Sequence, residues 1–93
     1  LAHQINWDRI ATQIDTVYTT GPGCGRCLLT KRALDKEGIT YREVNIRENP
    51  AAREYVTEEL GYTVAPVVVV DDDDHWCDLR PDHIERVAAH FAA

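Results

Sequence analysis

Strand-like and helix-like stretches alternate along this chain, and this alternation limits the possible folds more than any other feature of the sequence. Residues 16–20 and 39–46 are rich in β-branched and aromatic side chains, as strands are. Helix-forming residues occupy 25–37 between them, and Gly38 stands where that helix is expected to end. A strand, a crossover helix and a second strand form a right-handed parallel pair. The first half of the chain therefore predicts a βαβ unit.

The second half predicts another helix, a hairpin and a final helix. Asn49 and Pro50 form a helix-start signal for a helix that closes at Gly61. The valines of 67–70 suit a strand buried on both faces, and 75–77 reads as its return strand. The last helix opens at Arg80-Pro81 and carries apolar residues at helical spacing, namely Ile84, Val87, Ala88 and Phe91. The order β-α-β-α-β-β-α predicts an α/β fold with a four-stranded mixed sheet flanked by helices.

The polar run between the two hairpin strands consists of Asp71, Asp72, Asp73 and Asp74. Four consecutive carboxylates could bind calcium or magnesium, but the Gly and Glu of an EF-hand loop are missing. We therefore interpret the run as a solvated hairpin turn.

The N-terminal residues form a separate part in this reading. Trp7, Ile10, Ala11 and Ile14 recur at helical spacing, so residues 1–15 are predicted to be an extension containing a short helix. Residues 16–93 form one domain, because the 93-residue chain is too short for two hydrophobic cores.

Charge and cysteine content restrict the class of protein. A net charge of −6 and the lack of a basic stripe argue against nucleic-acid binding, and no apolar run is long enough to span a membrane. Three cysteines fit poorly with a secreted disulfide framework. Residues 1–15 show neither a charged leader nor an apolar stretch. We expect a cytoplasmic protein.

Cys24 and Cys27 form a Cys-x-x-Cys pair placed directly after a strand and a Gly-Pro-Gly turn, where a helix begins. Unpaired N–H groups and the helix dipole at such a position favour a thiolate, and Arg26 adds positive charge. One helical turn brings the second sulfur close to the first. The pair is therefore predicted to exchange disulfides, with Cys24 attacking and Cys27 resolving the mixed disulfide.

Two alternative readings of the pair stay open. The cysteines could be structural, although inert buried cysteines have no reason to flank a helix start. They could also form half of a zinc site, with His75 and Cys77 as further ligands in a non-enzymatic interaction module. Against zinc, the sequence has no second Cys-x-x-Cys or His-x-x-x-His unit.

Several motifs follow one another in a characteristic order. They are Pro22-Gly23-Cys24-Gly25-Arg26-Cys27, Arg32-Ala33-Leu34-Asp35-Lys36, Ala65-Pro66-Val67-Val68-Val69, His75-Trp76 and Arg80-Pro81-Asp82. Together they resemble NrdH-redoxin, the glutaredoxin-like electron donor of class Ib ribonucleotide reductase. The resemblance covers about residues 16–89, and its combination of motifs is far more specific than Cys-x-x-Cys alone.

The resemblance implies a thioredoxin fold, a cis bond before Pro66 and a redox-active Cys24–Cys27 disulfide with no bound cofactor or metal. Sequence spacing alone would leave that proline trans. The implied partners are ribonucleotide reductase, which is reduced, and thioredoxin reductase, which supplies electrons from NADPH. The backbone of Ala65 is expected to pair with a substrate segment. Other residues expected to contact partners are Pro22, Gly25, Arg26, Trp76 and Asp78.

Three positions differ from the family's usual pattern. The family usually has Lys before the proline of the active-site loop, whereas this chain has Thr20-Gly21 before Pro22. Asp78 replaces a Gly, which brings the segment closer to the Asp-bearing motif of glutathione-using glutaredoxins. A glutathione-dependent glutaredoxin is therefore the alternative function. Cys77 replaces a Ser, and we interpret it as a half-buried filler side chain rather than a third redox thiol.

Overall fold

The computed structural model describes residues 13–92 and contains one four-stranded mixed sheet. Its strands are β1 (Gln13–Thr19), β2 (Thr40–Asn45), β3 (Val67–Asp71) and β4 (Asp74–Cys77), in the order β2-β1-β3-β4. β1 runs parallel to β2, whereas β3 runs antiparallel to both of its neighbours, β1 and β4. The predicted α/β class and mixed sheet are confirmed.

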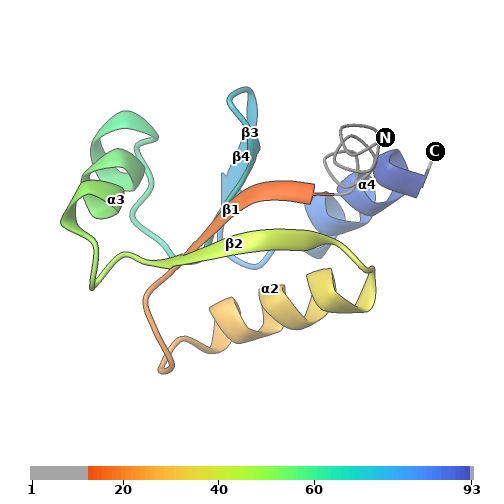
Figure 1. Ribbon diagram of the computed structural model, residues 1–93, viewed down its shortest axis with the longest axis horizontal. Coiled ribbons are helices and arrows are strands. Elements are labelled where there is room, and N and C mark those ends of the chain that lie inside the picture. The colour runs from red at the N-terminus through yellow and green to blue at the C-terminus, as the bar shows by residue number, and fades with distance from the viewer. Residues whose placement is uncertain (1–12, 93) are drawn as a thin grey trace, which may run out of the picture.

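Helices cover both faces of this sheet (Figure 1). α2 (Gly25–Lys36) and α4 (Pro81–Ala92) lie on one face, and α3 (Pro50–Glu54) lies on the other, where it continues into a π-helical turn, η1 (Tyr55–Glu59). α3 and η1 together fill the range predicted as one helix. Within residues 13–92 no helix is long and apolar enough to cross a membrane.

The helix signals in the sequence act as expected. Asn49 caps α3, because its side-chain oxygen accepts a hydrogen bond of 3.0 Å from the Ala52 N–H. Gly38 follows α2 with a φ of 73°, a conformation that suits glycine, and its N–H donates to the Asp35 carbonyl. These local signals fix where α3 begins and where α2 ends.

The valines of β3 divide the hydrophobic core between the two faces of the sheet. Val68 packs with the α2 and α4 side chains Leu34, Ile84 and Val87, and with Trp76 of β4. Val67 and Val69 point the other way and pack with Val56 and with partly buried tyrosines and leucine of the α3–η1 side. The alternation confirms that β3 is buried on both faces.

The start of β1 differs from the prediction. The strand begins at Gln13, so residues 13–15, which were assigned to the extension, belong to the sheet. Ile14 is fully buried in the core that faces α2 and α4, because the register of the strand directs it inward. Trp7, Ile10 and Ala11 lie outside the described residues.

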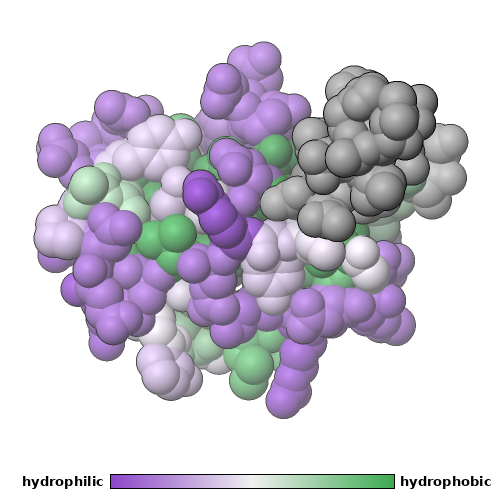
Figure 2. Space-filling model, in the orientation of Figure 1, coloured by the Kyte–Doolittle hydropathy of each residue, from purple (hydrophilic) through white to green (hydrophobic). Residues whose placement is uncertain are grey.

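The acidic run forms the β3–β4 turn, as predicted. Asp71 pairs with Asp74 across the hairpin, and the Asp71 side chain accepts a hydrogen bond of 2.8 Å from the Asp73 N–H. Asp74 also forms a two-bond ion pair with Arg86 of α4. Figure 2 shows a largely hydrophilic face of the molecule with small apolar patches between polar side chains.

Candidate active site at the start of helix α2

Cys24 caps the first turn of α2. Its Sγ accepts a hydrogen bond of 3.2 Å from the Cys27 N–H, and its own N–H donates to the Gly21 carbonyl at 3.2 Å. Gly21 has a φ of 97°, which L-residues rarely adopt, so glycine is needed for this turn. The turn holds the Cys24 sulfur at the positive end of the α2 dipole, where negative charge is stabilised.

Cys24 and Cys27 form a disulfide, and their Cα atoms lie 5.2 Å apart. Cys24 is half-buried at the end of the loop, whereas Cys27 has only 2% of its surface exposed. A substrate can therefore reach the sulfur of Cys24, whereas the sulfur of Cys27 is accessible mainly to Cys24. The pair thus has one accessible and one protected sulfur, an arrangement suited to two-step disulfide exchange.

Ala65 and Pro66 are joined by a cis peptide bond directly before β3. Pro66 is buried, and its carbonyl accepts a hydrogen bond of 2.8 Å from the Asp78 N–H. This hydrogen bond connects the cis-proline loop to the segment between β4 and α4. The cis bond agrees with the family resemblance and not with sequence spacing alone.

Asp78 connects this segment to the cysteine loop. Its Oδ1 lies 3.3 Å from an Arg26 guanidinium nitrogen and also accepts a 2.7 Å hydrogen bond from the Leu79 N–H. Asp78 has a φ of 72°, in the region where glycine is easiest and Asp is among the better tolerated residues. Asp78 therefore occupies a conformation that usually favours glycine. From this position it forms an ion pair with Arg26, the residue that stands between Cys24 and Cys27 in the sequence.

The other residues expected to contact partners lie in different settings. Pro22 and Gly25 are exposed on either side of Cys24. Trp76 is only 4% exposed, and its ring stacks on His83 with centroids 4.8 Å apart. Trp76 therefore supports the site from within the core and offers little surface to a partner.

Cys77, Arg80 and Asp82, which the sequence analysis also singled out, form contacts within the fold. Cys77 is a half-buried free cysteine opposite Val67 in the β3–β4 ladder. Arg80 and Asp82 form a two-bond ion pair at the start of α4. The hydrogen bond from Arg80 lowers the pKa of Asp82.

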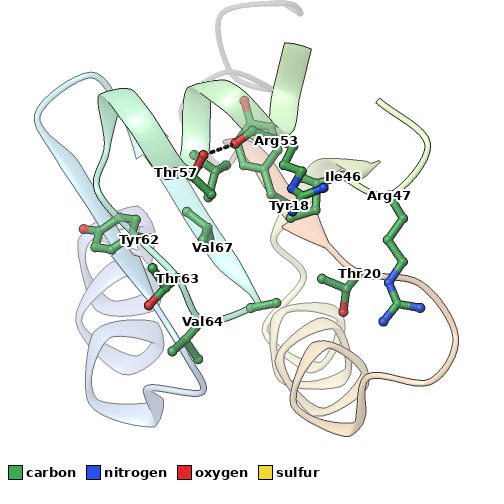
Figure 3. Close-up of a pocket in the computed structure, with 12 residues that line it drawn as sticks. Tyr18, Thr20, Ile46, Arg47, Arg53, Thr57, Tyr62, Thr63, Val64 and Val67 are labelled. Atoms are coloured by element: carbon green, nitrogen blue, oxygen red, sulfur yellow. Dashed lines mark hydrogen bonds between the residues drawn. The ribbon is translucent and has the colours of Figure 1, made fainter. Parts of the chain in front are cut away.

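A groove beside the cis-proline loop was not predicted from the sequence. It has a volume of about 450 Å³ and lies between the loop that precedes β3 and the segment that follows β2 (Figure 3). Its walls include Arg47, Arg53, Thr63, Val64 and Ala65, of which only Ala65 is predicted from the sequence to contact a substrate. Arg47 could have been placed here, because parallel β1 and β2 end at the same edge of the sheet.

No group of three or more His, Cys, Asp and Glu side chains in residues 13–92 is placed to hold a metal ion. The Nδ1 atom of His75, a ligand in the zinc reading, lies 2.8 Å from the Tyr62 hydroxyl. Cys24 and Cys27 are bonded to each other.

The chain is similar in sequence to known proteins over most of its length. Residues 16–76 match the glutaredoxin family. The glutaredoxin-like protein NrdH of Escherichia coli strain K12 is 35% identical over 80 residues, which cover 84% of this chain and 95% of that protein. The Gene 56 protein of Mycobacterium phage L5 is 33% identical over 93 residues, which cover 96% of this chain and 89% of that protein.

The fold of this chain is also similar to that of a solved structure. The structure of the glutaredoxin-like protein NrdH-redoxin from Escherichia coli, described by its thioredoxin-like activity profile, superposes with a TM-score of 0.71 at 35% identity. The match covers 80% of this chain and 92% of that one. With its thioredoxin fold and its Cys24–Cys27 pair at a helix start, this chain belongs to the glutaredoxin family and is an NrdH-like thiol–disulfide oxidoreductase.

Proposed function

We propose that this protein is an electron donor that reduces a disulfide of class Ib ribonucleotide reductase and is itself reduced by thioredoxin reductase. The single observation that carries the proposal is the half-buried Cys24 at the start of α2, bonded to Cys27, which is only 2% exposed. A cytoplasmic setting is part of the proposal, because glutathione and thioredoxin systems keep dithiols reduced there.

In the proposed reaction, the Cys24 thiolate attacks one sulfur of the substrate disulfide. The substrate S–S bond breaks, the second substrate sulfur leaves and takes up a proton, and a mixed disulfide with Cys24 remains. The Cys27 thiol then loses its proton and attacks the Cys24 sulfur. The Cys24–Cys27 disulfide forms, and the first substrate sulfur is released as a thiol. Two electrons and two protons have passed to the substrate.

The protein has chemical groups suited to each step of this reaction. The Cys27 N–H and the α2 dipole stabilise negative charge on Cys24, and Arg26 adds a cation beside it. In residues 13–92 the backbone amides and carbonyls of 63–65 form no hydrogen bond with other backbone groups. We propose that the backbone groups of Ala65 pair with an extended substrate segment, while Pro22, Gly25 and Asp78 border that segment. Pro66 is buried, so we propose that it positions the Ala65 backbone rather than contacting the segment.

The choice of reductant follows the NrdH relatives. The solved Escherichia coli NrdH-redoxin is described by a thioredoxin-like activity profile, which supports thioredoxin reductase over glutathione. Glutathione is the second candidate, because Asp78 supplies a carboxylate beside the site and two arginines line the neighbouring groove.

A coupled assay separates these reductants. NADPH oxidation is followed at 340 nm with ribonucleotide reductase as the acceptor, and electrons enter through thioredoxin reductase or through glutathione and glutathione reductase. We expect turnover with thioredoxin reductase and little with glutathione. The Cys24→Ser variant serves as the control and should be inactive with both. Turnover with glutathione alone would overturn the proposed donor.

A further inference from the structure

The groove beside the cis-proline loop carries positive charge in an otherwise acidic molecule. The chain has 16 Asp and Glu against 10 Lys and Arg, a net charge of −6. The groove nevertheless contains two arginines, Arg47 and Arg53, and no carboxylate among its lining residues. The local charge is therefore opposite in sign to that of the whole chain.

Neither guanidinium is neutralised within the described chain. The ion pairs among residues 13–92 join four other cations to carboxylates, and none involves Arg47 or Arg53. The side chains of both arginines also form no hydrogen bond within that part of the chain, although the Arg53 carbonyl accepts one from Thr57. Glu54 and Glu58 line an adjoining hollow with the same arginines, yet no ion pair connects them.

The positions of the two arginines relate them to the substrate path. Figure 3 shows Thr20 and Arg47 together on one side of the groove and Thr63 and Val64 on the opposite side. Arg53 lies with Tyr18 and Ile46 farther along the groove. The backbone that is free to pair with a substrate and the unpaired cations therefore share one groove.

The floor of the groove is apolar. Val56 and Val67 are both buried and belong to the core cluster that packs η1 against the sheet. Val64, on the rim, is one of the exposed large apolar side chains of the described chain. A groove with an apolar floor, free backbone and two cations matches an extended peptide that has both apolar and acidic side chains.

We infer that this groove selects disulfide substrates whose cysteine lies in an acidic peptide segment. The inference rests on the proposed disulfide-reductase function and names the class of substrate segment it takes. Ala65 pairs with the backbone of the segment, and Arg47 and Arg53 form charge-assisted hydrogen bonds with its Asp or Glu side chains. Without these arginines the net negative charge of the protein would repel such a segment.

A pair of synthetic peptides tests this inference. Each peptide is closed by one disulfide, and the two differ only in carrying Glu or Gln at the positions that flank the cysteines. The protein is reduced with dithiothreitol and desalted, and the loss of each peptide disulfide is followed by chromatography. We expect the Glu peptide to react about tenfold faster than the Gln peptide at low salt, and the preference to fall as salt is added.

Charge-matched variants identify the cause of the preference. The Arg47→Gln/Arg53→Gln variant should lose the preference. The Arg32→Gln/Lys36→Gln variant, which removes two exposed cations of α2 that form no ion pair with residues 13–92, should keep it. Equal rates for the two peptides with the wild-type protein would overturn the inference. A preference that survives in the Arg47/Arg53 variant would overturn it as well.

Two further substrates separate this inference from the proposed function. Hydroxyethyl disulfide is small and neutral, so its reduction reports the cysteine chemistry without the groove. Failure of the wild-type protein with every disulfide would contradict the proposed function, whereas reduction of hydroxyethyl disulfide without a charge preference would contradict only the groove assignment. Dependence on the two arginines for oxidised glutathione but not for the acidic peptide would also overturn the assignment.

Discussion

The guanidinium of Arg26, which stands between the two cysteines in the sequence, lies 3.3 Å from the carboxylate of Asp78. This contact joins the first turn of α2 to the segment between β4 and α4, and Asp78 in turn binds the Pro66 carbonyl through its N–H. The side chains of Arg26 and Asp78 are 60% and 44% exposed, so their ion pair adds little to the stability of the fold. Its main consequence is electrostatic, because Asp78 offsets the positive charge that Arg26 brings to the site.

Replacing Asp78 with Asn tests this electrostatic role. Asn tolerates a positive φ and retains a side-chain oxygen for the Leu79 N–H, but it removes the negative charge. We expect the pKa of the Cys24 thiol to fall, because removing a nearby negative charge favours the thiolate. The rate of alkylation by iodoacetamide as a function of pH measures this value.

Asp72→Asn provides a matched control for that measurement, because Asp72 is exposed in the β3–β4 turn. It should leave the pKa of the Cys24 thiol unchanged. A pKa that rises in Asp78→Asn, or that moves equally in both variants, would contradict the assigned role of Asp78.

Thr30 offers a test of core energetics below the cysteines. It is fully buried on α2, and its hydroxyl has no hydrogen-bond partner in the described part of the chain. Thr30→Val keeps the shape and removes the unsatisfied group, so it should raise the free energy of unfolding of the oxidised protein by about 1 kcal/mol. Thr30→Ser should lower it by about 1 kcal/mol through loss of a buried methyl group. Urea unfolding measures both, and a less stable valine variant would show that the hydroxyl does have a partner.

The raised pKa of Tyr41 predicts how the free energy of unfolding changes at alkaline pH. Burial, followed by the Asp35 carboxylate, raises the pKa of Tyr41 to about 12. In the unfolded chain tyrosine ionises near pH 10, so above that pH the unfolded state binds fewer protons than the folded state. The free energy of unfolding should therefore fall as the pH rises from about 10 to about 12.

The Tyr41→Phe variant should lose part of that decline, as urea unfolding at pH 9, 10 and 11 would show. Some decline should remain, since burial also raises the pKa of Tyr18 and Tyr62. An unchanged slope in Tyr41→Phe would mean that the Tyr41 hydroxyl is not protected in the folded state.

The difference in exposure between the two cysteines leads to a prediction about trapped intermediates. Cys27→Ser should form a stable mixed disulfide between Cys24 and a disulfide substrate, because the resolving sulfur is missing. Mass spectrometry of the product should show one substrate thiol bound per protein. Cys24→Ser is the matched control and should trap almost none, since Cys27 is buried. Equal trapping by both variants would remove the distinction between the two roles.

Much of the fold was predictable because its signals are local. The Asn49 cap, the turn after α2 at Gly38 and the four valines of β3 each determine a boundary or a face through neighbouring residues. The start of β1 was not predictable in the same way. Ile14 fits a helical spacing with Trp7 and Ile10, and only pairing with β2 and β3 makes it part of a strand.

The cysteine site was largely predictable, whereas its surroundings were not. A strand, a tight turn and a helix start place Cys24 and Cys27 by short-range geometry. The ion pair between Arg26 and Asp78 depends instead on segments that are far apart in the sequence. The groove likewise requires residues after β2, on α3 and before β3 to meet, which the order of elements does not specify in detail.

The central claim is that the Cys24 sulfur is the nucleophile because the start of α2 stabilises its anion. The most direct measurement is alkylation of the reduced protein by iodoacetamide between pH 4 and 10, with each modified cysteine identified by peptide mass spectrometry. We predict that Cys24 reacts first, with an apparent pKa below the ordinary value for a free cysteine, and that Cys27 reacts slowly throughout. An apparent pKa for Cys24 at or above about 8.5, the ordinary value for a free cysteine, or faster labelling of Cys27, would contradict the account.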